Sequence, residues 1–428
     1  MNLLIIKNPD KFWLKIAKEL TDLKKVIWVG TSDNHKDLKN FTHSESILCK
    51  KKIKIKNKIG LNNSDFDLIN ENYTFLNDIL NRYTANYSEI YFENKRRYII
   101  DCYEFWKNII LSYPVDKVIS RRVPHRFYDN LIYLICRNYK VPIIFLDNTT
   151  EIYPIKDQLK TGYYFSNNLN FRTALFKKKI TKKNQKLARE YIKLIKKKSK
   201  IDLRPNYFKN KINIKPSLYL KIKMICPKII VFIYLFLKSY LVKKKEFKII
   251  FEKEKYKVRE ASNFEILLHN YSSQIKLKNY INYYSKKSLY AESIKKKKYL
   301  YLSLSRDFEK TVCPDGKYFK NVNFIVDYIL YYLPKNYYLV IKEHPECMKI
   351  NNASFINRSK SFLDNIIKKS KKIILIKVNE DQVKLISNAK AIVTLTGTSA
   401  WEAAILGKYA AIFGTCWYER FVSIDNIK

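Results

Sequence analysis

Short apolar runs, each followed by a polar or glycine-containing loop, recur at both ends of the chain. In the first 150 residues they occupy positions 3–6, 26–29, 117–120 and 142–146. Stretches with helical periodicity separate them, notably residues 9–23, 73–111 and 128–139. Strands connected by helices of this length predict a parallel sheet with helices on both faces. The loops after the carboxyl ends of such strands line the ligand crevice.

A second set of alternating elements ends the chain. Strands are predicted at 299–304, 337–342, 373–377, 391–396 and 410–414, with helices at 324–333, 381–388 and 400–406. The predicted fold class is therefore α/β, with two Rossmann-like domains facing a cleft and a basic, mostly helical middle region. The boundaries expected from this pattern are 1–160, 161–295 and 296–428.

The middle region has lysine clusters at 177–179, 196–198, 243–245 and 295–298 and shows no alternation of strands and helices. One interpretation is a solvated, helical connection. The other interpretation is that the apolar run 229–237, which lysines flank, lies on an anionic membrane surface. The run is too short to span a bilayer. The apolar segment at the start of the sequence is also too short for the apolar region of a signal peptide.

The chain carries a formal net charge of +44, but its basic residues are 14 Arg and 69 Lys. Nucleic-acid binders that rely on fork-like contacts use more Arg, so nucleic acid is not an expected partner. The seven cysteines are dispersed, which fits a reducing compartment and argues against a zinc knuckle or a disulfide framework. We see no Asp-x-Asp cluster that would hold a metal ion, and no metal or cofactor is expected.

The most informative window is residues 396–407, TGTSAWEAAILG. A strand that leaves through Gly397 into Thr398 and Ser399 and then a helix offers backbone N–H groups, two hydroxyls and a helix dipole to an anion. Glu402, in the first turn, can accept hydrogen bonds from ribose hydroxyls. The alternative is a capping box, because Ser399-x-x-Glu402 also satisfies the helix's own N–H groups.

His344 follows another strand of the same predicted sheet, between Glu343 and Pro345. An imidazole held there can donate to a phosphate and stay cationic beside it. The alternative is a strand-terminating loop with an incidental histidine. Because both loops follow parallel strands, we expect them to lie close together at one edge of the sheet.

Residues 299–425 resemble the capsule polysaccharide biosynthesis/export family, which includes Kdo transferases with two Rossmann-like domains in the GT-B arrangement. The resemblance rests on residues 342–345 (KEHP), 381–386 (DQVKLI), 396–404 (TGTSAWEAA), Gly407-Lys, and 413–418 (FGTCWY). A weaker likeness covers residues 115–150, and none covers 160–295.

The resemblance implies a nucleotide-binding C-terminal domain and an acceptor-side N-terminal domain. His344 then contacts the nucleotide's phosphate, with Lys342 in the same motif. Gly397, Thr398 and Ser399 form a turn facing that phosphate, and Glu402 lies near the ribose. Residues 304–309 (LSRDFE) depart from the family's Leu-His-x-Gln-Pro-Glu stretch. The chain also ends at Lys428, soon after the last motif, so a C-terminal truncation is expected.

These observations predict a metal-independent glycosyltransferase, with a nucleotide sugar such as CMP-Kdo as donor and a surface polysaccharide or glycolipid as acceptor. The base that activates the acceptor is sought among Asp147, His125 and Glu151, all near strand exits. The expected location is cytoplasmic, or peripheral at the inner face of the cytoplasmic membrane. A nucleotide-sugar epimerase and a basic nucleic-acid-binding protein remain the alternatives.

Overall fold

A computed structural model of the 428-residue chain describes its two main sheets and most of the helices around them. The described residues are 1–6, 24–30, 41–43, 58–84, 92–120, 124–148, 163–166, 228–241, 248–251, 258–306, 311–313, 315–349, 358–416 and 424–427, with a few isolated positions. Some predicted features lie outside them, namely the helix at 9–23, the lysine clusters at 177–179, 196–198 and 243–245, and Glu151.

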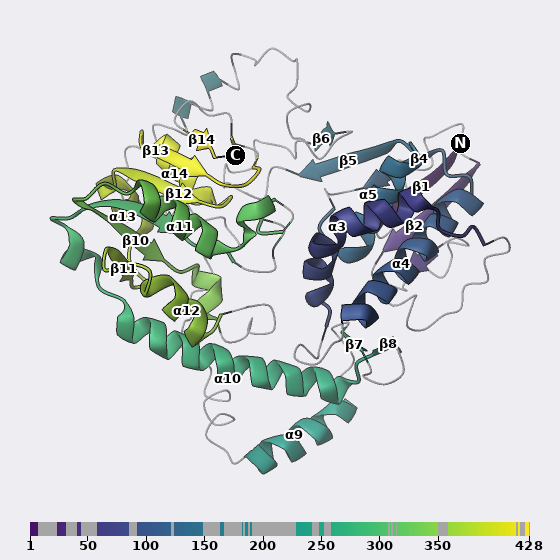
Figure 1. The fold of residues 1–428 in the computed structure, drawn as a ribbon, viewed down its shortest axis with the longest axis horizontal. Coiled ribbons are helices and arrows are strands. Elements are labelled where there is room, and N and C mark those ends of the chain that lie inside the picture. The colour runs from purple at the N-terminus through teal and green to yellow at the C-terminus, as the bar shows by residue number, and fades with distance from the viewer. Residues whose placement is uncertain are drawn as a thin grey trace. The chain divides into compact units, whose positions relative to one another are not determined.

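The N-terminal part of the chain forms a six-stranded sheet in the order β3-β2-β1-β4-β5-β6 (Figure 1). Its strands run parallel except β6, which pairs antiparallel with β5. The strands predicted from the apolar runs are all present. The bounds are β1 (Asn2–Ile6), β2 (Lys25–Gly30), β3 (Phe41–His43), β4 (Lys117–Ser120), β5 (Ile143–Asn148) and β6 (Tyr163–Ser166).

A buried polar cluster fixes the helices of this part: α3 (Asn63–Asn81), α4 (Phe92–Ser112) and α5 (Phe127–Asn138). Lys107 Nζ lies 2.7 Å from Asp65 Oδ2, and both side chains are almost completely buried. The hydroxyls of Tyr103 and Tyr139 also donate to the Asp65 carboxylate. Because a buried charge is tolerated only when it is paired and hydrogen-bonded, this cluster holds the start of α3 against α4 and α5.

The C-terminal sheet has the order β11-β10-β9-β12-β13-β14, and every pair in it is parallel. This is the strand order of the Rossmann fold, in which the order reverses between the first and fourth strands, here β9 and β12. The predicted α/β class with two Rossmann-like sheets is confirmed. The bounds are β9 (Lys298–Ser303), β10 (Tyr337–Lys342), β11 (Ile373–Ile376), β12 (Ala391–Thr394), β13 (Tyr409–Ile412) and β14 (Ile424–Asn426).

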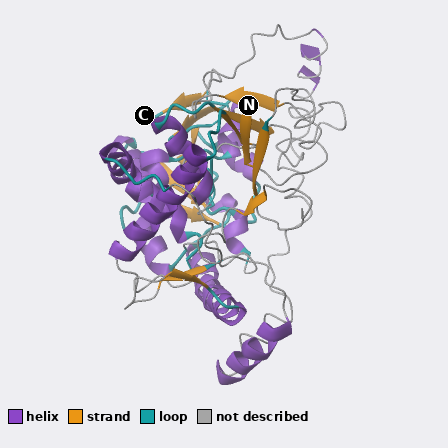
Figure 2. Ribbon diagram, turned by 90° about the vertical axis from the view of Figure 1, so that its right-hand side faces the viewer, coloured by secondary structure: helices purple, strands orange, loops and turns teal. Residues whose placement is uncertain are grey.

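Helices pack against both faces of the C-terminal sheet. Figure 2 distinguishes the helices of the chain, in purple, from its strands, in orange. Successive residues of a strand point to opposite faces. Leu339 and Ile341 therefore pack with α11 (Val322–Tyr332) and α12 (Lys360–Ile367), whereas Val340 packs with α13 (Gln382–Asn388) and α14 (Thr398–Ile405). Such a strand, buried on both faces, explains the continuous apolar run in the sequence.

The region between the sheets is not only a solvated connection. It contains α9 (Lys228–Leu241), β7 (Ile249–Phe251), β8 (Val258–Glu260) and α10 (Asn263–Lys287). Ile249 N–H donates to the Tyr83 carbonyl at 2.7 Å, which joins β7 to the N-terminal part. Tyr280 and Tyr284 of α10 are buried in the core of the C-terminal sheet. The sequence pattern, dominated by lysine clusters, therefore did not predict that β7 joins the N-terminal part or that α10 packs into the C-terminal core.

The chain divides into two compact units. The first contains the described parts of residues 1–150, 160–175 and 238–266, and the second contains those of residues 151–159, 176–237 and 267–428. Three short 3-10 helices complete the second unit: η2 (Ala291–Ile294), η3 (Lys317–Lys320) and η4 (Pro345–Met348). Among the described residues, no helix has the length and apolar character needed to cross a membrane.

Candidate functional site

The loops after β10 and β12 lie at the same edge of the C-terminal sheet, as predicted. His344 follows β10 and Gly397 follows β12, and both strands pair in parallel with β9. Neighbouring strands are about 4.8 Å apart, so the two strand ends are about 10 Å apart across β9. This edge contains the point between β9 and β12 where the strand order reverses, the usual ligand position in such sheets.

Gly397 forms the turn that starts α14. Its N–H donates to Thr394 Oγ1 at 3.1 Å, and its carbonyl accepts a hydrogen bond from the Tyr418 hydroxyl. A Cβ atom at this position would lie 2.6 Å from Thr394 Oγ1, so any other residue would force the turn to move. The Gly397 N–H is thus used within the turn, and the first N–H groups that α14 can offer a ligand belong to Thr398 and Ser399.

The capping-box interpretation of Ser399 and Glu402 is wrong. The N-cap of α14 is Gly397, with no side-chain capping bond, and Ser399 is the second residue of the helix. The Ser399 side chain is buried, and its Oγ has no hydrogen-bond partner among the described residues. A buried hydroxyl without a hydrogen-bond partner destabilises a protein by about 1–3 kcal/mol. The presence of such a hydroxyl beside the start of α14 therefore requires an explanation.

Glu402 is buried one turn further along α14, at 3% exposure. Gln382 Nε2 donates to its Oε2 at 2.7 Å, and Thr398 Oγ1 lies 3.5 Å from its Oε1. Gln382 belongs to α13 and was part of the 381–386 motif, although its partner was not predicted. The amide fixes one carboxylate oxygen and so sets the orientation of the other.

His344 is the N-cap of η4, and its ring is held by the backbone. Nδ1 accepts a hydrogen bond from the Glu346 N–H at 3.2 Å, so the neutral ring carries its proton on Nε2. Burial lowers the pKa of His344 to about 4, although the Glu343 and Glu346 carboxylates act in the opposite direction. Burial alone therefore favours a neutral ring that donates through Nε2. The cationic imidazole is predicted for a ring beside a phosphate, and this stays a prediction.

Lys342 is buried at the end of β10, where its Nζ donates to the Glu380 main-chain carbonyl at 2.6 Å. This contact ties β10 to the segment that enters α13. The structure thus gives Lys342 a partner in the backbone rather than bringing its ammonium group together with His344.

Glu343, between these two residues, is the centre of a network that the sequence did not reveal. Its carboxylate accepts from Arg358 Nε and from the Tyr280 hydroxyl, both at 2.6 Å, and from the His344 N–H at 2.7 Å. The Tyr284 hydroxyl accepts from the Glu343 N–H at 3.0 Å. Burial raises the pKa of Glu343, but the charge of Arg358 and these hydrogen bonds outweigh it, and the net shift is downward.

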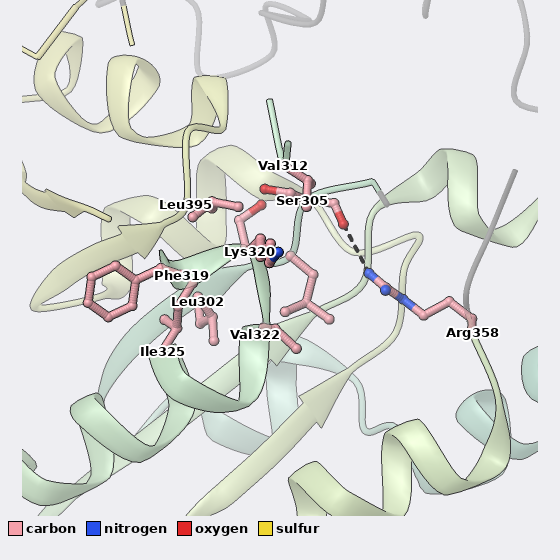
Figure 3. Close-up of a pocket in the computed structure, with 11 residues that line it drawn as sticks. Leu302, Ser305, Val312, Phe319, Lys320, Val322, Ile325, Arg358 and Leu395 are labelled. Carbon is pink, nitrogen blue, oxygen red and sulfur yellow. Dashed lines mark hydrogen bonds between the residues drawn. The ribbon is translucent and has the colours of Figure 1, made fainter. Parts of the chain in front are cut away.

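A small pocket that is open to solvent lies beside this network at the carboxyl end of β9 (Figure 3). Arg358 forms part of its wall, and Nη2 donates to the Ser305 carbonyl at 2.9 Å. Ser305 Oγ is buried without a hydrogen-bond partner among the described residues. The polar lining is completed by Ser303 and Lys320. Leu395, which follows β12, closes the other side, so the pocket lies where the strand order reverses.

The loop after β9 is fastened to the loops after β12 and β13. Thr396 Oγ1 donates to the Thr311 carbonyl at 2.8 Å, and the Thr415 N–H donates to the Asp315 carbonyl at 2.9 Å. A Cβ at Gly414 would lie 2.6 Å from the Asp315 oxygen, so glycine permits this close approach. In the stretch that departs from the family pattern, Arg306 pairs with Glu309 at 3.0 Å.

Two of the three base candidates lie among the described residues, both near strand ends of the N-terminal sheet. The His125 N–H donates to Asp129 Oδ1 at 3.1 Å, and Nδ1 lies 3.6 Å from Asp129 Oδ2. Asp147 is in β5 and pairs with Tyr164 of β6 through the backbone. Their role stays a prediction.

Among the described residues, no group of three or more His, Cys, Asp and Glu side chains is close enough to hold a metal ion.

The comparison with protein families confirms the predicted resemblance. Residues 244–421, less than half of the chain, match the family described as "Capsule polysaccharide biosynthesis protein". No curated protein matches the sequence.

Solved structures resemble the chain at low identity. A beta Kdo 2,7 transferase, KpsC of Thermosulfurimonas dismutans, is 19% identical over 40% of this chain and 51% of that chain, with a TM-score of 0.25. The alignment thus spans about half of that chain. A UDP-GlcNAc 2-epimerase from Methanocaldococcus jannaschii is 14% identical over 100% of this chain and 89% of that chain, with a TM-score of 0.24.

Proposed function

We propose that the protein is a glycosyltransferase of capsule synthesis, which moves a sugar from a nucleotide-sugar donor to a capsule polysaccharide, another surface polysaccharide or a glycolipid. The observation that carries this proposal is the turn at Gly397–Ser399. It lies inside the segment that matches the capsule biosynthesis family, and it keeps a buried hydroxyl without a partner at a helix start. These are the features of a phosphate site.

In this proposal, the donor's phosphate lies at the start of α14. The N–H groups of Thr398 and Ser399 and the Ser399 hydroxyl donate to it, and the helix dipole adds to the attraction. The ribose hydroxyls donate to Glu402, which Gln382 orients. A phosphate held by donors that are already in place gains stabilisation as negative charge builds on it during sugar transfer.

His344 then donates through Nε2 to the leaving phosphate. As a neutral donor it contributes a hydrogen bond rather than a charge, and we expect His344→Ala to lower turnover more than donor affinity. Lys342 acts at a distance from the ligand, by tying β10 to α13. The pocket lined by Ser305 and Arg358 is the proposed place of the transferred sugar, because it opens at the same sheet edge.

A base from the N-terminal domain, His125 or Asp147, would remove the proton of the acceptor hydroxyl. The proposal needs no metal. The proposal does not specify the nucleotide of the donor. CMP, as in CMP-Kdo, is the first candidate. The proposed place of reaction is the inner face of the cytoplasmic membrane.

A thermal-shift screen of the full chain with CMP, UDP, GDP and their sugars tests the proposal. A nucleotide that binds the native state at about 100 times its dissociation constant adds about 2.7 kcal/mol of stability, which raises the melting temperature. We expect one nucleotide class to do so, and Ser399→Ala to reduce the shift. No shift with any nucleotide or nucleotide sugar would contradict the proposal.

The same nucleotide sugar then separates the alternatives. An epimerase converts it in the absence of an acceptor, whereas a transferase requires an acceptor for its product. A nucleic-acid-binding protein would instead bind duplex or single strands with an affinity that falls steeply as salt rises, and would ignore the sugar nucleotides.

A further inference from the structure

Helix α9 exposes large apolar side chains to a degree that folded proteins rarely tolerate. In a helix of 14 residues, only Val231 and Leu235 are reported as buried apolar side chains, at 3% and 0% exposure. The other large apolar side chains described for this helix are exposed, namely Ile230, Phe232, Ile233, Tyr234, Phe236, Leu237, Tyr240 and Leu241.

The spacing of these residues makes a continuous outer face. At 100° per residue, positions 230, 233, 234, 237, 240 and 241 fall on one side of the helix, and 231 and 235 fall on the other. Exposed fractions on the outer face range from 38% at Tyr234 to 85% at Leu241. The inner stripe is buried, and the outer face is exposed. Contiguous exposed apolar faces of this kind mark an interaction site.

The length of α9 and the charge of the sequence around it indicate what kind of partner its outer face binds. Fourteen residues extend about 21 Å, short of the roughly 30 Å of a bilayer's hydrocarbon core, so the helix can lie in the interface but cannot span it. Residues 221–247 contain seven lysines and a single acidic residue, Glu246. Tyr234 and Tyr240 on the outer face combine an apolar ring with a polar hydroxyl, as residues at the headgroup level do.

We propose that α9 is a membrane-surface anchor that lies in the plane of an anionic bilayer. Its outer face enters the boundary between headgroups and acyl chains, and the lysines next to it in the sequence attract the anionic headgroups. This inference goes beyond the transfer reaction and does not depend on it. It gives the chain a means to meet an acceptor carried on a membrane without a spanning segment.

Vesicle flotation of the full chain tests the anchor. The probes are vesicles of phosphatidylcholine alone and with about 30% phosphatidylglycerol, in NaCl from about 0.05 M to about 0.5 M. We expect flotation with the anionic vesicles, weaker at high salt and weakest with phosphatidylcholine alone. Ile233→Glu and Leu237→Glu should each reduce partitioning about tenfold or more, since each removes an apolar side chain and adds a negative charge.

Tyr331→Glu is the control, because Tyr331 is a large exposed side chain on another helix, α11, at 82% exposure against 53% at Ile233 and 59% at Leu237. It should float like the wild type. Melting temperatures of all three variants should stay at the wild-type value, because the changed side chains are on the surface. The shift produced by a nucleotide should also be unchanged in them, which separates this inference from the proposed transfer reaction.

Three outcomes would overturn the anchor. The first is that the wild type fails to float with anionic vesicles. The second is that Ile233→Glu and Leu237→Glu float as well as Tyr331→Glu. The third is that the wild type sediments as a dimer that these two substitutions disperse while flotation is absent, which would make the outer face of α9 an interface with a second copy of the chain.

Discussion

Glu343 and Arg358 form an ion pair that is shielded from solvent, with Arg358 Nε 2.6 Å from Glu343 Oε2 and side-chain exposures of 2% for Arg358 and 0% for Glu343. The pair connects the two parts of the candidate site. On one side, Glu343 accepts from the His344 N–H, and on the other, Arg358 donates to Ser305 in the pocket wall. A substitution of either charged residue is therefore expected to disturb both the loop that contains His344 and the wall of the pocket.

Arg358→Met should destabilise the protein by about 3–5 kcal/mol, because it leaves the Glu343 carboxylate buried and uncompensated. Urea unfolding followed by circular dichroism measures this. The double variant Glu343→Gln, Arg358→Met should recover part of the loss, since no charge is then left unpaired.

The exposed pair Lys295–Glu292, with side chains 71% and 81% exposed, provides the control. Lys295→Met should change the free energy of unfolding by no more than about 0.5 kcal/mol. Equal effects at the two pairs would contradict the view that burial gives Glu343 and Arg358 their importance.

The strands could be predicted from the sequence because each is buried on both faces and reads as an apolar run between loops. The His344 and Gly397 loops could be placed at one edge because parallel strands have their carboxyl ends together. Arg358 could not be found, since nothing in its local sequence shows that it folds back onto Glu343. Tyr280 and Tyr284 carried a weak signal, because their spacing puts both on one face of α10.

Local sequence patterns also gave a wrong prediction where they did not define the first residue of a helix. Ser399-x-x-Glu402 fits a capping box only if the helix begins after Ser399, and it begins at Thr398. The charge of His344 could not be predicted either. It depends on how deeply the ring is buried and on the Glu346 N–H that it accepts, and both are set by η4.

Ser399→Ala should leave stability unchanged or raise it, because the removed hydroxyl has no partner among the described residues. Nucleotide affinity should fall by about 1 kcal/mol or more, roughly fivefold or more, if this hydroxyl donates to the donor's phosphate. Thermal unfolding and isothermal titration calorimetry give the two values.

The matched control is Ser288→Ala, a buried serine whose Oγ donates to the Ser285 carbonyl. It should lose a little stability and keep the wild-type nucleotide affinity. A Ser399→Ala protein that loses stability but binds nucleotide normally would remove Ser399 from the phosphate site.

Glu402→Gln tests the ribose contact. The glutamine can still accept from Gln382, but its amide replaces an acceptor with a donor where a ribose hydroxyl would donate. We expect the affinity for the nucleotide to fall by about 1.5–3 kcal/mol, roughly 10- to 150-fold. The affinity for the corresponding 2′-deoxynucleotide, measured by the same calorimetry, should fall much less. Equal losses for both ligands would argue against a contact to the 2′-hydroxyl.

His344 should make stability depend on pH in the acidic range. Its pKa is about 4 in the folded protein against an ordinary value of 6.5, so the unfolded chain binds more protons between these values. The free energy of unfolding therefore falls as pH decreases through this window. His344→Asn keeps an acceptor for the Glu346 N–H but does not titrate. Between pH 7 and pH 4, the wild type should lose about 1–3 kcal/mol more than this variant in urea unfolding. Parallel pH profiles for the two proteins would show that the ring is not held neutral by burial.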